Sequence, residues 1–471
     1  MTNRKSTKRA LLGSVMAMVL CLAMLVGATF AWFTDTASTG VNKIQAGNLD
    51  VALEMKDAAG QWVSAEGKTL DFVKAADAKG EAILWEPGCT YTLPELRVVN
   101  NGNLALKYKV TITGINGSAK LNEAIEWTIG DVAMGAEQHL KAGESNEFTI
   151  KGHMKESTGN EYMNESIDGI AITVAATQDT VENDSLGNTY DKDAKYPIVA
   201  MDTLQELINN ATEPVSAKLE GNIAGSLTVP QGKDVTLDLN GFTLTGGDSH
   251  AILNHGTLCI KDSSGNGKIV ASKANTSALR NASDCVIDGG TFTRAAGVDN
   301  KWHTVENFGT MTFNGGKVIA EDGQSFAIVN GWNYINPGEQ KATMTINNIE
   351  MIASPNGFKN CAGGTLTMNG GTLHCTGYWG LSNDSTGVAT INGGQIISDK
   401  YVAISNGGAK MEINGGTFTG PQGSLYVQNY AQGTVVMGGS YGNETVEFMR
   451  NYCPEGYTAT LKDGMVVVSK D

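Results

Sequence analysis

A short motif that recurs through the second half of this 471-residue chain restricts the possible folds more than any other feature. Six strand-like segments each end in Asn or Asp at a turn, and most continue with two glycines: VIDGGTF, MTFNGGKV, MTINNIEM, LTMNGGTL, ATINGGQI and MEINGGTF. Apolar residues lie one and three positions before every corner, and the residue between them is mostly Thr, which is the alternation of a β-strand. The last four corners are 22, 23 and 22 positions apart, and this period predicts a parallel β-solenoid.

A second column of asparagines runs in step with the first. Each member follows an apolar residue two positions earlier, and the members are Asn254, Asn281, Asn307, Asn330, Asn360, Asn383, Asn406 and Asn429. Asparagine suits such corners because it tolerates left-handed backbone geometry and can hydrogen-bond the same residue one coil away. We therefore expect a structural ladder of asparagines, and nine or so coils at about 4.8 Å each would form a rod of roughly 45 Å.

A solenoid must cover the apolar cross-section and the strand edges at its two ends. The segment MDTLQELINNA has an apolar face, and Thr203 with Glu206 predicts a capping box, so we expect a capping helix over residues 203–211. VTLDLNGFTL would then open the first coil, and residues 440–471 would close the last. Residues 202–471 resemble bacterial surface proteins with a right-handed parallel β-helix of the pectate-lyase-like kind, a resemblance that specifies architecture better than activity.

The first half of the chain has a different strand pattern. Short alternating runs separated by turn residues predict an antiparallel β-sandwich over residues 32–177: NLDVALEM, ELRVVN, LALKYKVTITGI, EFTIKG and IAITVAA. Asn101-Gly102 lies between two of these runs and predicts a tight hairpin. The polar and acidic residues 178–201 are typical of a linker.

Residues 1–31 have the parts of a secretory signal peptide. A basic beginning and an apolar core from Ala10 to Val26 lead to small residues, and cleavage is expected between Ala31 and Trp32. A permanent membrane anchor stays open as the alternative, because about 17 apolar residues is near the lower limit for spanning a bilayer. If cleavage occurs, the membrane is contacted only through the leader beforehand.

The charge balance excludes one class of partner. After cleavage 30 basic and 49 acidic residues would remain, a formal net charge of −19. Binding to nucleic acid needs clustered Lys and Arg, so we expect no nucleic-acid partner. Six cysteines would remain without close pairs, and strand alternation points Cys259 outward but Cys285 inward. We therefore expect mostly free, buried cysteines rather than a disulfide framework.

The segments ATFAWFTDT, AGNLDV and WEPGCTYTLPELRVVNNGNLALKYKVTI resemble the TasA/camelysin family of Gram-positive bacteria, over about residues 10–180. The resemblance implies a leader processed by a dedicated (SipW-type) signal peptidase, a jelly-roll-like sandwich, and in several members polymerisation into extracellular biofilm fibres. In such fibres the segment freed by cleavage inserts as a strand into the next subunit. Here that donor strand would include Trp32, Phe33, Val41 and Ile44. The alternative is that this segment folds back onto its own sheet.

The residues give little support to an enzyme. The name camelysin implies a metalloprotease, but there is no HExxH motif, and we interpret His139 and His153 as ordinary polar residues. A polysaccharide lyase or hydrolase would need converging acids, whereas the solenoid charges Arg294, Glu306, Asp384 and Glu412 are scattered along the sequence. Loop residues could still be gathered by the fold, and the candidates are Lys301, His303, Glu321 and Asp322.

Aromatic residues mark one candidate binding stripe. Trp302, Tyr378 and Tyr401 each lie five residues before a corner asparagine, and Trp332 and Tyr334 lie in a longer insertion. Aromatic faces along a rod could seat the sugar rings of a polysaccharide or host glycan, or they could simply pack over the coil edge.

These observations predict a secreted, non-enzymatic protein of the cell surface or biofilm matrix. A fibre-forming sandwich would present the solenoid as an adhesive or spacer arm, without metal or other cofactor. The alternative is an extracellular carbohydrate-active enzyme, followed by a metalloprotease.

Overall fold

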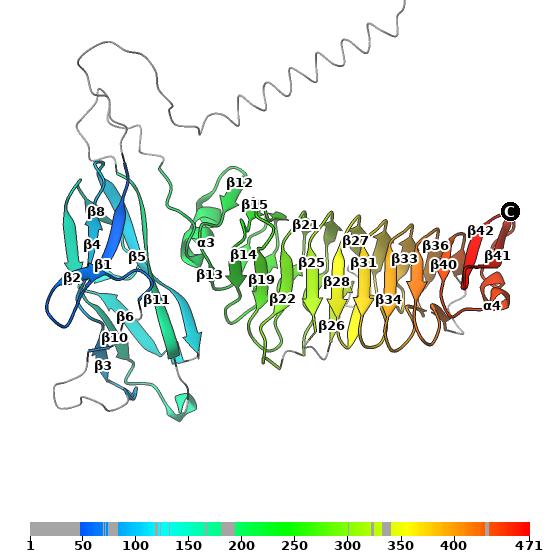
Figure 1. The fold of residues 1–471 in the computed structure, drawn as a ribbon, viewed down its shortest axis with the longest axis horizontal. Helices are drawn as coiled ribbons and strands as arrows, with labels where there is room; N and C mark the ends of the chain where they lie inside the picture. Colours follow the sequence, from blue (N-terminus) through cyan, green and yellow to red (C-terminus); the bar gives the residue numbers. More distant parts are fainter. Residues whose placement is uncertain are drawn as a thin grey trace, which may run out of the picture. The chain divides into compact units, whose positions relative to one another are not determined.

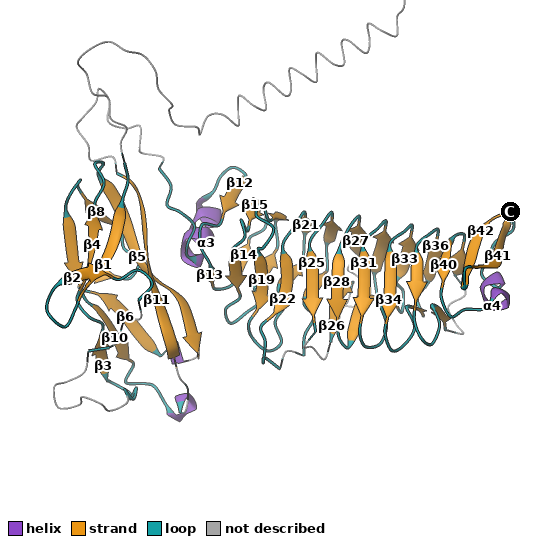
Figure 2. Ribbon diagram, viewed as in Figure 1, coloured by secondary structure: helices purple, strands orange, loops and turns teal. Residues whose placement is uncertain are grey.

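The computed structural model describes residues 48–471 except 69, 71, 74–82, 118–120, 123, 131, 164, 166, 180–193, 300, 322–324, 332–340 and 429–432. Within them the chain is nearly all β, with antiparallel sheets in the N-terminal part and a parallel solenoid in the C-terminal part (Figures 1 and 2). The predicted fold class is therefore confirmed. The predicted signal sequence, its cleavage point at Ala31 and Trp32, and the donor segment from Trp32 to Ile44 lie outside the described residues.

Three antiparallel sheets make up the described N-terminal part, together with the 3-10 helix η1 (Asn160–Tyr162). The first sheet has the strand order β2 (Trp62–Ser64), β1 (Val51–Lys56), β4 (Leu96–Asn100) and β9 (Ser145–Phe148). The second has β3 (Thr90–Thr92), β10 (Ile150–Met154), β6 (Ile125–Ile129) and β7 (Val132–Ala133). The third has β11 (Ile167–Gln178), β5 (Leu106–Gly117) and β8 (Gln138–Leu140).

The core of this part follows from strand alternation. In β4 the side chains of Leu96 and Val98 are fully buried while Arg97 and Val99 are half-buried, as expected when one face of a sheet packs inward. Leu106 and Tyr108 of β5 and Ile150 of β10 join the same apolar cluster, so strands of all three sheets share one core.

Two details of the N-terminal prediction are wrong. Asn101-Gly102 does not form a hairpin, because β4 pairs with β1 and β9 whereas β5 pairs with β11 and β8. Gly102 instead lies against the start of β1, where a Cβ atom would come within 2.3 Å of the Asn48 carbonyl oxygen. The run EFTIKG is also not one strand, since it is split between β9 and β10 in different sheets.

The solenoid has three parallel sheets, each receiving one strand per coil in its regular part (Figure 1). The ten-stranded sheet contains β12 (Val215–Lys218), β15 (Asp234–Asp238), β18 (Thr257–Lys261), β21 (Asp284–Ile287), β24 (Thr310–Phe313), β27 (Ala342–Ile346), β30 (Gly364–Met368), β33 (Val388–Ile391), β36 (Lys410–Ile413) and β39 (Thr434–Val436).

The twelve-stranded sheet contains β13 (Ile223–Ala224), β16 (Thr243–Thr245), β19 (Lys268–Ala271), β22 (Thr291–Arg294), β25 (Lys317–Ala320), β28 (Glu350–Ala353), β31 (Thr372–Cys375), β34 (Gln395–Ser398), β37 (Thr417–Thr419), β40 (Gly439–Tyr441), β42 (Met465–Lys470) and β41 (Tyr457–Lys462). The nine-stranded sheet contains β14 (Leu227–Val229), β17 (Ile252–Asn254), β20 (Leu279–Asn281), β23 (Val305–Asn307), β26 (Phe326–Asn330), β29 (Asn356–Asn360), β32 (Leu381–Asn383), β35 (Ile404–Asn406) and β38 (Leu425–Val427). The first coil thus opens with β12, one coil before the predicted VTLDLNGFTL.

Equivalent residues of successive coils stack in register along each sheet. In the ten-stranded sheet, for example, Met311 pairs with Met344 and Phe313 pairs with Ile346. These inward side chains are fully buried, so every coil adds a layer to one continuous apolar core.

The corner asparagines at the end of the nine-stranded sheet form a buried ladder, which we call the inner ladder. Its described members are fully buried, and they are Asn254, Asn281, Asn307, Asn330, Asn360, Asn383 and Asn406. Each Nδ2 donates to the Oδ1 of the next coil toward the C-terminus at 2.7–2.8 Å, and Asn406 donates to Thr434 Oγ1 at 2.8 Å. Asn429, the predicted eighth member, lies outside the described residues.

The corners at the end of the ten-stranded sheet form a second, outer ladder. Here each Nδ2 donates to the previous coil, toward the N-terminus, and the series runs Asn414, Asn392, Asn369, Asn347, Asn314 and Asp288 with distances of 2.8–2.9 Å. Where two glycines follow a corner, the second is needed for its backbone conformation, with φ of 94° at Gly394 and 117° at Gly416.

Both ends of the solenoid are covered. Helix α3 (Met201–Asn210) buries Leu204 and Ile208 in the solenoid core. The predicted capping box is wrong, because the helix begins at Met201 and its N-cap is Ala200, which offers no side-chain acceptor. At the other end α4 (Val446–Arg450) and the antiparallel hairpin of β41 and β42 follow the last regular coil.

Candidate functional site

The structure separates the predicted aromatic stripe into two places. Tyr378 and Tyr401 belong to neighbouring coils, with ring centroids 6.4 Å apart, and Trp379 contacts both of them. These three residues, which we call the aromatic cluster, include the 53% exposed Tyr378. Trp302 lies elsewhere, with its ring 5.5 Å from that of His303. Trp332 and Tyr334 lie outside the described residues.

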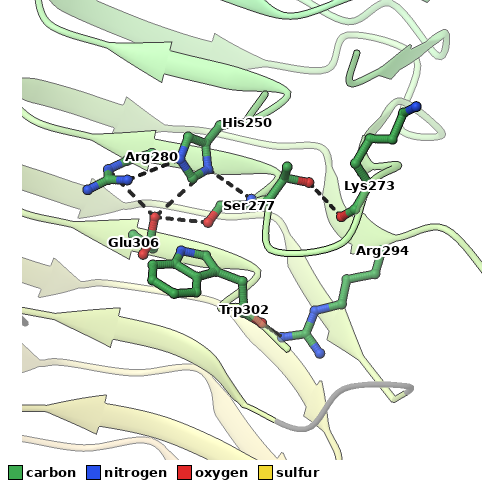
Figure 3. Close-up of polar contacts among 8 residues, drawn as sticks. His250, Lys273, Ser277, Arg280, Arg294, Trp302 and Glu306 are labelled. Carbon is green, nitrogen blue, oxygen red and sulfur yellow. Dashed lines mark hydrogen bonds and ion pairs between the residues drawn. The ribbon is translucent and has the colours of Figure 1, made fainter. Parts of the chain in front are cut away.

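Contrary to the sequence prediction, one of the scattered charges converges with other polar side chains. Glu306 projects from β23 beside Arg280 of β20, because the two are paired neighbours in the nine-stranded sheet. The Oε2 atom of Glu306 accepts a hydrogen bond from Ser277 Oγ at 2.9 Å and lies 3.8 Å from Arg280 Nε. His250 completes this polar cluster, with its Nδ1 atom 4.0 Å from Glu306 Oε2 (Figure 3).

Burial is the main cause of the pKa shifts of Glu306 and His250 in the polar cluster. Glu306 is only 1% exposed, and burial raises the pKa of its carboxyl, while the Arg280 charge and hydrogen bonds from Ser277 and Trp302 act in the opposite direction. Burial and the Arg280 charge lower the pKa of His250 to about 4. At neutral pH His250 is therefore an uncharged imidazole beside a guanidinium.

The hydrogen bonds of Ser277 exclude a serine–histidine nucleophilic pair. Its hydroxyl donates to Glu306, and it is the Ser277 backbone N–H that donates to His250 Nδ1, at 2.9 Å. A general base would have to accept from the hydroxyl itself. Glu306 could act as a buried acid, whereas the cluster as it stands does not activate Ser277.

Arg294 orders the loop that carries Trp302. Its guanidinium is largely buried and donates to the carbonyl oxygens of Trp302 at 2.7 Å and Phe326 at 3.2 Å. These bonds join β22 to the turn that carries Trp302 and to the first residue of β26, and Figure 3 shows Arg294 reaching the Trp302 main chain. Arg294 is thus placed near the polar cluster as a structural cation.

Most of the other charged residues that the sequence offered as possible catalytic groups contact separate partners and do not join the polar cluster. Lys301 pairs with Asp299 at 3.3 Å, and His303 contacts Ser325 Oγ through Nδ1 at 2.7 Å. Asp384 pairs with Lys359 at 3.1 Å, and Glu412 with Lys410 at 3.2 Å. Glu321 is exposed, and Asp322 lies outside the described residues.

The histidines of the N-terminal part have separate polar partners. His139 Nδ1 lies 2.6 Å from Asp179 Oδ2 and its Nε2 lies 3.8 Å from Glu137 Oε1, while His153 Nδ1 lies 2.9 Å from Thr90 Oγ1. Throughout the described ranges, no three His, Cys, Asp or Glu side chains are grouped as metal ligands. The six cysteines that the structure describes are all free, with Cys285 buried and Cys259 half-buried as alternation predicts.

Sequence reasoning missed Trp379, His250, Ser277 and Arg280. A signal for Arg280 was present, because reading the position before each inner-ladder asparagine gives Arg280 and Glu306 in consecutive coils. Opposite charges at one repeat position predict a contact between coils. His250 and Ser277 lie in turns of unequal length, for which the repeat gives no alignment.

Comparison with known families gives one match, over the first part of the chain. The model of the camelysin metallo-endopeptidase family matches residues 6–59, so the chain is similar to that family over a stretch that ends just after β1. No curated protein and no solved structure matches the chain. As for membrane insertion, no helix within the part that the structure describes has the length and hydropathy to cross a bilayer.

Proposed function

We propose that this is a secreted, non-enzymatic protein of the cell surface or biofilm matrix. The N-terminal part self-associates by strand exchange, and the solenoid serves as a stiff spacer or adhesive arm. A signal peptidase would cut between Ala31 and Trp32. The segment from Trp32 to Ile44, still attached to the chain, would then add as a strand to a sheet of a neighbouring copy.

The observation that carries this proposal is the edge strand β11. It is twelve residues long and, among the described residues, pairs with β5 alone. Its other edge offers a row of backbone N–H and C=O groups, which is the template that an added strand requires. The similarity to the camelysin family across residues 6–59 supports the same proposal, since extracellular location is general in that family.

The solenoid supports the role of a spacer or adhesive arm. Each coil is joined to the next by three parallel strand pairs and two side-chain ladders, so bending the rod would break many hydrogen bonds at once. The aromatic cluster supplies a candidate contact for a polysaccharide or host glycan, because exposed aromatic faces stack on sugar rings.

The test compares secreted protein that begins at Trp32 with a version lacking residues 32–44. We expect the longer protein to sediment as polymers and to form filaments in negative stain, while the shorter one stays monomeric. The shorter protein must keep the β-rich circular dichroism spectrum of the longer one. Monomers in both preparations would refute strand exchange.

A carbohydrate-active enzyme is the second candidate, and Glu306 is the observation that favours it. A buried carboxyl with a raised pKa can serve as a general acid, as glycoside cleavage requires. Release of reducing ends or unsaturated products from a polysaccharide panel, abolished in Glu306→Gln, would establish this function in place of the non-enzymatic one.

A further inference from the structure

We propose that His250 and Arg280 form a binding site for an oxyanion, such as the sulfate or carboxylate group of an acidic polysaccharide. This inference is independent of strand exchange, because it concerns only the solenoid. It starts from the protonation of one imidazole ring.

The position of the His250 proton is fixed by its neighbours. The Ser277 backbone N–H donates to His250 Nδ1 at 2.9 Å, so Nδ1 must be the unprotonated nitrogen. In the uncharged ring the proton therefore lies on Nε2, which makes Nε2 a hydrogen-bond donor.

The second donor is the guanidinium of Arg280. Its Nη1 atom lies 3.1 Å from His250 Nε2, although both atoms carry protons and neither can accept. An oxygen atom that accepts from both groups would satisfy the two donors together. A metal cation is disfavoured here, since Nε2 offers no lone pair and a guanidinium stands beside it.

Arg280 is held in position, but among the described residues its guanidinium N–H groups are not all used in hydrogen bonds. Its guanidinium lies over the Phe308 ring, at 5.1 Å from the centroid, and Glu306 is 3.8 Å from Nε, too far for a hydrogen bond. Within the described part of the chain, Arg280 makes no hydrogen bond to a carboxylate. A planar guanidinium with free N–H groups is suited to bidentate recognition of sulfate, phosphate or carboxylate.

The pair is reachable from solvent. The Arg280 side chain is 35% exposed and that of His250 is 13% exposed, whereas Glu306 below them is only 1% exposed. A ligand therefore meets the two donors first, with Glu306 acting as a positioning residue for Arg280. Figure 3 shows Lys273 pointing away from this pair, which makes it a matched control.

The experiment is calorimetric titration of the full secreted chain at neutral pH with dextran sulfate, uncharged dextran, inorganic sulfate and acetate. We expect dextran sulfate to bind and uncharged dextran not to bind. Arg280→Gln should weaken binding at least tenfold, while Lys273→Gln, which removes the same charge nearby, should leave affinity within about twofold. Tighter binding of dextran sulfate than of inorganic sulfate identifies a polysaccharide as the source, and equal binding per sulfate identifies a free anion.

Two results would overturn the proposal. One is equal affinity of wild type and Arg280→Gln, and the other is the absence of binding by every anionic probe. Circular dichroism must show that both variants are folded. If Arg280→Gln does not fold, Arg280→Lys replaces it, because lysine keeps the charge but loses the guanidinium fork, and binding should still weaken. Filament formation should be unchanged in all variants, so the two proposals fail separately.

Discussion

Asparagine side chains have different environments at the two corners of the coil. Asn360 of the inner ladder is fully buried, and its Nδ2 donates to Asn383 Oδ1 and to the Val388 carbonyl oxygen. Asp288 is the N-terminal member of the outer ladder and accepts from Asn314 Nδ2. A carboxylate fits at Asp288 because the first member of that ladder has no previous member to which it must donate.

This difference predicts opposite outcomes for exchanging amide and carboxylate. Asn360→Asp removes a donor and places a buried charge against carbonyl oxygens, so the free energy of unfolding should fall by about 3 kcal/mol or more. Asp288→Asn keeps an acceptor for Asn314 and should change the free energy of unfolding by less than about 0.5 kcal/mol. Urea denaturation measures both values, and equal stability of the two variants would contradict the account.

Two histidines, His303 which is buried and His250 which is largely buried, give the solenoid a pH dependence. Burial is the main cause that lowers the pKa of His250 to about 4 and that of His303 to about 3, from an ordinary value of 6.5. The unfolded chain then binds protons that the folded chain does not, so stability is present above pH 6.5 and lost as pH falls toward these values. Glu306, whose pKa is raised, acts in the opposite direction.

We expect stability to fall by about 1.4 kcal/mol per pH unit for each histidine between roughly pH 6 and 4.5. His303→Gln keeps a polar group near Ser325 but does not titrate, so its stability should fall less steeply with acid than that of wild type. Urea denaturation at several pH values gives the two curves. Parallel curves would show that His303 is not the titrating group.

At the scale of elements, the hydrophobic pattern predicted most solenoid strands from their alternation and the existence of helix α3 from its apolar face. It failed at β9 and β10, because apolar residues alternate through Thr149 without Gly or Pro to mark the change of sheet. It also failed at the start of α3, where Thr203 and Glu206 fit a capping box but the helix begins two residues earlier. Burial of Met201 against the solenoid core accounts for that earlier start.

Helix α3 should therefore stabilise the solenoid through packing rather than capping. Leu204→Ala should lower the free energy of unfolding by about 2–4 kcal/mol, because Leu204 is fully buried in the core. Thr203→Ala, one residue away, should change it by less than about 0.5 kcal/mol. Thermal and urea denaturation of the two variants would decide this, and a larger effect at Thr203 would restore the capping interpretation.

At the scale of the whole molecule, the repeat made the solenoid predictable because each coil restates the same pattern. The polar cluster was less predictable. His250, Ser277 and Trp302 lie in turns of different lengths, so the repeat does not show that their side chains come close together in the fold. Equal spacing also did not show which aromatic rings touch, since Tyr378 contacts Tyr401 whereas Trp302, at the same repeat position, lies against His303.

If coils are independent layers, a whole coil can be removed. Deleting residues 388–409 joins Gly387 to Lys410, and Asn383 would then face Thr434 as Asn406 does now. We expect this variant to stay folded with a modestly lower melting temperature. Deleting only 388–398 shifts the register of both ladders and should give a protein that is sensitive to protease. Loss of structure in both variants would contradict layer-by-layer stability.

The opposed directions of the two ladders bear on the electrostatics of the solenoid. A row of side-chain amides that all donate one way adds up to a dipole, as the peptide groups of a helix do. The inner ladder points its N–H groups toward the C-terminus and the outer ladder points them toward the N-terminus. Their dipoles are opposed and largely cancel, so the two ladders together leave little net dipole along the solenoid axis.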